Sequence, residues 1–106
     1  MTHTKVSYED VEPVSDGLYF LRDPLDAENL GVSVLECEPG YTGLEHDHAE
    51  DGQEEVYVLV EGEATVTVDG EDVEMAAGDA LRIPPEATRK ITSVDAESQF
   101  VLTGAP

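Results

Sequence analysis

The stretch EEVYVLVEGEATVTVDGE, from Glu54 to Glu71, indicates the fold of this 106-residue chain. Its apolar run VYVLV (56–60) has the length and composition of a buried strand, and an acid–glycine pair ends it. The next segment, ATVTV (64–68), alternates apolar and polar residues, as a half-buried strand does. Asp69-Gly70 is a strong hairpin signal, and the return strand begins over residues 72–75. Antiparallel strands joined by a tight turn are therefore predicted at the centre of the chain.

Segments of the same kind lie on both sides of this hairpin. They are short, rich in Val, Ile, Leu and Tyr, and separated by Gly and Pro turns. We expect strands at residues 17–22, 30–38, 80–83, 88–94 and 98–103. The helix signal is weak and lies in YEDVEP (8–13), where Pro13 ends it. Many short strands with close turns predict an all-β antiparallel sandwich or small barrel.

Length and composition predict one domain, residues 1–106, with a core at about 17–103 and an N-terminal arm at 1–12. Hydrophobic residues make up 40% of the chain, which is enough to build a core. No apolar run is long enough to cross a bilayer, and the first residues lack the layout of a signal peptide. We therefore expect a cytoplasmic protein without a membrane partner. The single cysteine, Cys37, excludes an intrachain disulfide.

The net charge of −20 comes from 25 acidic residues against 5 basic ones. The acids occur in nearly every segment, which predicts an acidic surface all round the molecule. Nucleic acid is excluded as a partner, because phosphate binding needs clustered Lys or Arg. Self-repulsion at this density is screened by salt, so we expect a protein adapted to a halophile's high internal salt. The alternative, an acidic mimic of nucleic acid, is disfavoured because the acids are interleaved with ordinary strand patterns.

The sequence EHDHAEDGQEE, which precedes VYVLV, contains two histidines one residue apart. Residues two apart on a strand face the same side, so His46 and His48 are expected to project together. Glu55, at the start of the next strand, is a candidate third ligand. Two imidazoles and a carboxylate suit Fe, Zn, Mn, Ni or Cu better than Ca or Mg. Taken alone, the same letters also fit a solvated acidic loop that holds no metal.

The wider spacing resembles the first motif of the cupin superfamily. That motif has a glycine, five intervening residues, a His-x-His pair, a glutamate after a short gap, six intervening residues and a second glycine. Gly40, His46, His48, Glu55 and Gly62 fit this pattern, although the gap of six residues before the glutamate is two longer than usual. The strand and hairpin that follow also look like those of the family.

The second cupin motif matches only in part. A glycine followed after five residues by a proline is present as Gly78 and Pro84. Glu86 stands where a second glycine is usual, Arg89 where the fourth metal ligand, a histidine, is usual, and Ser93 where an asparagine is usual. The resemblance covers roughly residues 30–103. It implies a cupin-like double-stranded β-helix, or jelly-roll barrel, and a homodimer.

The arginine at position 89 allows two arrangements of the candidate site, one with a metal ion and one without. Arginine offers no lone pair to a metal. In one outcome His46, His48 and Glu55 hold one divalent transition metal, and Arg89 anchors an anionic substrate in a pocket that Tyr57 also lines. In the other, no metal binds, and an Arg89–Glu55 ion pair fills the old site.

Three functions follow from these outcomes. The first is a metal-dependent oxygenase or isomerase that acts on a small anionic molecule. The second is a non-catalytic barrel that binds or senses a small ligand. The third is a salt-adapted protein that has lost its ancestral activity. The fold does not decide between them.

Overall fold

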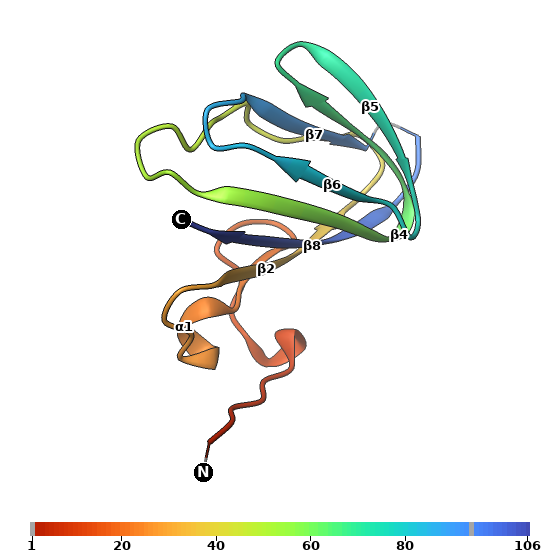
Figure 1. Cartoon of the computed structure of the whole chain (residues 1–106). Coiled ribbons are helices and arrows are strands. Elements are labelled where there is room, and N and C mark those ends of the chain that lie inside the picture. The colour runs from red at the N-terminus through yellow and green to blue at the C-terminus, as the bar shows by residue number, and fades with distance from the viewer. Residues whose placement is uncertain (1, 94) are drawn as a thin grey trace.

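The structure is a computed structural model that describes residues 2–93 and 95–106. Within these residues eight antiparallel strands form one curled sheet, ordered β1-β2-β8-β4-β7-β3, with β5 and β6 also paired to β4 (Figure 1). The strands are β1 (Leu18–Phe20), β2 (Gly31–Cys37), β3 (Tyr41–Thr42), β4 (Glu54–Val68), β5 (Glu71–Ala76), β6 (Ala80–Ile83), β7 (Arg89–Ser93) and β8 (Ser98–Ala105). The all-β barrel expected from the sequence is confirmed. No described helix is long and apolar enough to span a membrane.

Strand β4 joins the two halves of the barrel. Its first part pairs with β6 and β8, and its second part pairs with β5 and β7. Between Leu59 and Glu61 the register against β8 shifts, which marks a β-bulge. The shift changes the inward-facing positions from odd numbers, as at Leu59, to even numbers, as at Val66. A bulge bends a strand and increases its twist, so one strand serves both sides of the barrel.

Gly62 makes this bend possible. Its φ is +83°, and a Cβ atom here would lie 1.9 Å from the backbone oxygen of Glu97. A side chain therefore fits neither the backbone conformation nor the space. The sequence predicted that this glycine ends one strand and begins another. That prediction was wrong, because the chain continues through the bulge without a turn.

The barrel interior is closed by large apolar side chains from several strands. Leu59, Val66, Ile83 and Phe100 are all 0% exposed. Burying each of them contributes about 1.5–3 kcal/mol through the hydrophobic effect. Cys37 joins this cluster, and burial raises the pKa of its thiol. Cys37 is therefore a small residue of the core, 3% exposed.

The N-terminal residues extend from one side of the barrel and return along it (Figure 1). A single 3-10 turn, η1 (Tyr8–Asp10), forms where the weak helix signal lies. The hydroxyl of Tyr8 donates to Glu36 at 3.2 Å and accepts from Gln99 at 3.1 Å. Part of the expected arm is therefore attached to β2 and β8.

Two short elements differ from the expectation. Helix α1 (Arg22–Leu25) forms across Asp23-Pro24, which the sequence suggested as a stop. Proline is tolerated there because a first-turn N–H has no partner inside the helix. Strand β3 pairs with β7 at Ser93 and Thr92. It is only two residues long, which is too short to give a periodicity signal in the sequence. Val94, the expected last residue of the strand that begins near Thr88, lies outside the described residues.

Candidate metal centre

The candidate ligands come from one loop and one strand. His46 and His48 lie in the loop between β3 and β4, and Glu55 lies in β4. The backbone of His46 exchanges two hydrogen bonds with Arg89, at 3.0 and 2.8 Å, and the N–H of His48 donates to the carbonyl of Pro85 at 2.9 Å. The histidines were expected on a regular strand. Instead, His46 forms an isolated β-bridge with Arg89, and His48 is held by a backbone hydrogen bond to Pro85.

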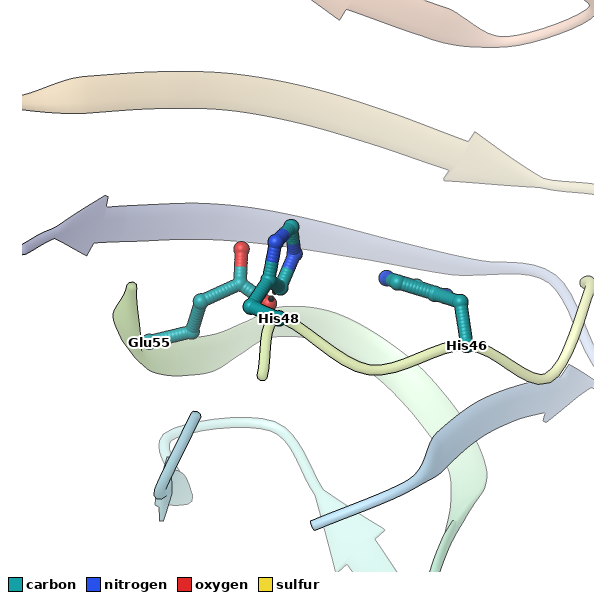
Figure 2. A group of neighbouring side chains, drawn as sticks. All are labelled: His46, His48 and Glu55. Carbon is teal, nitrogen blue, oxygen red and sulfur yellow. Dashed lines mark ion pairs between the residues drawn. The ribbon is translucent and has the colours of Figure 1, made fainter. Parts of the chain in front are cut away.

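Glu55 has a fixed backbone position. It pairs with Ile83 of β6 on one side and with Gly104 of β8 on the other. Its side chain points toward the two imidazoles, and Figure 2 shows all three groups directed into a common space. One ligand atom from each residue lies within 4.8 Å of the others. The structure thus brings together the three residues that the sequence suggested as a metal site.

Both imidazoles are held by their Nδ1 atoms. Nδ1 of His46 lies 3.2 Å from the carbonyl oxygen of Leu44, and Nδ1 of His48 lies 3.1 Å from both carboxylate oxygens of Asp51. Carbonyl and carboxylate oxygens only accept, so each Nδ1 carries the proton. In the neutral ring the lone pair is then on Nε2. Two Nε2 lone pairs and a carboxylate form a donor set that fits a divalent transition metal.

Nε2 of His48 lies 3.4 Å from Oε1 of Glu55, a distance that also suits an ion pair if the ring is protonated. A proton and a metal ion therefore compete for the same nitrogen. Metal binding at this site should weaken as the imidazole becomes protonated.

Arg89 lies behind the site with its side chain fully buried. Its Nη1 donates to Oε1 of Glu55 at 2.6 Å. Its Nη2 donates to the carbonyl of Pro84 at 2.7 Å, and its Nε to that of Ala87 at 3.1 Å. The cation is 0% exposed, and each of its three nitrogens makes one hydrogen bond to the protein. Sequence reasoning placed Arg89 near Glu55, and the structure places the two in direct contact.

Tyr57 adds a second donor to the same oxygen. Its hydroxyl donates to Oε1 of Glu55 at 3.3 Å. Burial raises the pKa of Tyr57 well above its ordinary value, and the nearby charge of Glu55 adds to this shift. The phenol therefore stays protonated. Among the described residues no group donates to Oε2 of Glu55, so this carboxylate is anchored through one oxygen and has the other available.

The ligand atoms face a cavity of about 730 Å³. Part of its wall is apolar, formed by Leu18, Leu35, Tyr41, Ile91 and Leu102. Tyr57 and Arg89, expected to line a substrate pocket, both border it. The charge of the wall differs from that of the whole chain. Arg22, Arg89 and Lys90, three of the 5 basic residues, line the cavity, whereas only Asp23 and Glu55 of the 25 acids do.

The sequence analysis did not identify the contact between Asp51 and His48. The available signal was an acid three residues after a histidine, a spacing that a turn can close. The N–H of Gly52 donates to the carbonyl of His48 at 2.8 Å and closes this turn. The donor role of Tyr57 was also missed, since residue parity places a side chain but does not identify its partner.

Comparison with known proteins agrees with this geometry. The model of the cupin domain family matches residues 33–103. An uncharacterised protein of Streptomyces coelicolor is 29% identical over 94 residues, which are 87% of this chain and 83% of that protein. A cupin protein from Bacteroides fragilis has a similar crystal structure, with a TM-score of 0.82 and 29% identity over 99% of this chain and 85% of that chain.

A second similar structure comes from Silicibacter pomeroyi and is described as a sugar phosphate isomerase from a cupin superfamily. Its TM-score is 0.76, at 25% identity over 96% of this chain and 75% of that chain. The family model covers more than half of the chain, including β4 and all three candidate ligands. This chain therefore belongs to the cupin domain family, with the jelly-roll barrel that the spacing around His46 and His48 implied.

Proposed function

We propose that this protein is a metal-dependent enzyme, an oxygenase or isomerase, that acts on a small anionic molecule in the barrel cavity. The observation that carries the proposal is the convergence of His46, His48 and Glu55, whose ligand atoms lie within 4.8 Å of one another at the cavity wall. Two imidazoles with free Nε2 atoms and a carboxylate with a free oxygen are a suitable set for Fe, Zn, Mn, Ni or Cu. When bound, such an ion supplies a Lewis acid or a redox centre.

The chain's own residues prepare this site. Arg89 and Tyr57 donate to Oε1 of Glu55, which anchors the carboxylate through that oxygen and leaves Oε2 without a hydrogen-bond donor among the described residues. Hydrogen bonds of this kind to a ligating carboxylate set its orientation and its affinity. The apolar wall lowers the local dielectric, so charges that act in the cavity are screened less than they are in water.

The charge of the wall favours an anionic substrate. Its three basic residues outnumber its two acids, in a chain where acids exceed bases fivefold. Arg89 acts through its charge from behind Glu55, because its nitrogens already have protein partners. Arg22 is exposed and is the better candidate for direct contact with the substrate. The similarity to the Silicibacter isomerase supports a sugar phosphate as one anion to test.

A second function is a metal-free barrel that binds or senses a small ligand. It is favoured by the Arg89–Glu55 contact at 2.6 Å, since the guanidinium already supplies the positive charge that an ion would bring. The same cavity would then select a ligand by shape and charge alone.

Metal content distinguishes the two functions. The protein, produced without a histidine tag and purified at high salt, is analysed for metals before and after chelation and after reconstitution. We expect about one equivalent of a transition metal per chain, because the described part of the chain holds one such three-ligand cluster. A His46→Ala/His48→Ala double variant is expected to lose it. No metal after reconstitution would overturn the enzyme proposal and leave the binding barrel.

A further inference from the structure

The loop between His48 and Glu55 places an acid against a candidate ligand. Residues 49–54 make the gap of six residues, and within it Asp51 turns back onto His48. Both carboxylate oxygens of Asp51 lie 3.1 Å from Nδ1 of His48. Asp47, in the same loop, instead accepts from the N–H of Ala49 at 3.1 Å. The contact with the ring is therefore specific to Asp51 and is not a general result of acidity.

We propose that Asp51 is a positioning residue for the metal centre, acting through His48. Its carboxylate holds the proton on Nδ1, so that the lone pair on Nε2 faces Glu55 and the cavity. The negative charge also makes the imidazole a stronger electron-pair donor to a metal ion. Asp51 does not reach the ion and is not a ligand. The inference rests on the proposed function in requiring a metal at this site.

The two histidines are held by different means. His46 is held by the backbone carbonyl of Leu44, which no substitution removes and which carries no net charge. The ring of His48 is held instead by the carboxylate of Asp51, whose side chain is 52% exposed. The turn that carries this side chain is closed by a backbone hydrogen bond between Gly52 and His48, and it lies in the loop outside the strands. Asp51 can therefore be changed without removing backbone contacts of the barrel.

The test compares Zn²⁺ affinity, measured by competition with a chelating dye, in the whole protein and two matched variants. Asp51→Asn removes the charge that faces His48, and Asp47→Asn removes the same charge from the same loop away from the ring. We expect Asp51→Asn to weaken Zn²⁺ binding roughly 10–100-fold, the usual effect of losing such a partner. Asp47→Asn should change it less than about twofold, as expected for a screened surface charge. Equal affinities in the two variants would overturn the proposal.

A second measurement does not depend on metal. Ring-nitrogen chemical shifts of His48, recorded by NMR on metal-free protein over a pH series and compared where they no longer change with rising pH, report which nitrogen carries the proton. We expect the Nδ1–H form in the parent protein and a mixture with the Nε2–H form in Asp51→Ala. An unchanged tautomer in Asp51→Ala would overturn the proposal even if Zn²⁺ binds. A parent protein that binds no Zn²⁺ but shows the expected shifts would instead overturn the metal-dependent function.

Discussion

Arg89 carries a positive charge into the barrel wall, where water cannot reach it. Three of its five N–H groups donate to protein acceptors, one of them the carboxylate of Glu55. A buried pair of this kind is costly to break, since the remaining charge has no solvent to replace its partner. Arg82 offers a contrast, because its ion pair with Glu54 joins side chains that are 62% and 52% exposed. The same chemistry therefore has different consequences at the two positions.

We predict that Arg89→Met lowers the free energy of unfolding by roughly 3–5 kcal/mol, the usual range for leaving one member of a buried pair. Arg82→Met should lower it by no more than about 1 kcal/mol. Urea unfolding of both variants measures the difference. Similar small losses would show that Arg89 contributes no more than a surface ion pair.

The candidate site could be predicted from the sequence as far as its ligands and no further. His46, His48 and Glu55 lie in one short stretch of the chain, so their spacing can be recognised as a motif. The contact of Arg89 with Glu55 joins residues 34 apart, and only the barrel topology brings them together. The contact of Asp51 with His48 is local, but it depends on a turn in a loop of unusual length. Loop conformation does not follow from hydrophobic periodicity.

At the scale of the element, β4 shows why a correct pattern gave an incorrect boundary. Its two apolar halves were recognised, and both are strand. Because glycine favours turns, a Glu-Gly pair after an apolar run predicts the end of a strand. Here the positive φ of Gly62 is used in a bulge, and the close approach of Glu97 requires glycine. A turn and a bulge can have the same local sequence. Here the pairing of β4 with β8 determines that the chain forms a bulge.

We predict that Gly62→Ala lowers the free energy of unfolding by more than about 3 kcal/mol, since backbone strain and the clash with Glu97 act together. Gly70→Ala is the control. Gly70 also has a positive φ, +80°, but no atom lies within 4 Å of a Cβ there. Its cost should be that of the left-handed conformation alone, about 1–2 kcal/mol. Equal losses in urea unfolding would mean that the clash is relieved by a small backbone movement.

The whole molecule is dominated by unbalanced charge. Of 25 acids, the described residues place two in ion pairs with arginine, Glu54 and Glu55. The remaining acids repel one another across a small surface, and this repulsion destabilises the compact state. The halophilic origin, the cytoplasmic location and the homodimer all stay predictions. The first has a direct physical test.

We predict that the unfolding temperature rises steeply with KCl from dilute solution to about 1 M, where the Debye length falls to roughly 3 Å. A rise of about 10 °C would correspond to roughly 2 kcal/mol for a domain of this size. Sucrose is the control, because it strengthens apolar burial without screening charge. A flat response to KCl would contradict the salt-adapted interpretation.

Strand β4 pairs with β5, β6, β7 and β8, and it also carries Glu55. A strand held by four neighbours on both sides of a barrel cannot open as a local unit. Its amide protons will therefore exchange with solvent mainly through events that open the whole domain. An ion bound at Glu55 would slow hydrogen exchange along all of β4, from the cavity to the distant hairpin. Metal occupancy of the cavity could then be measured as slower hydrogen exchange of the β4 amides, because the folded state opens less often.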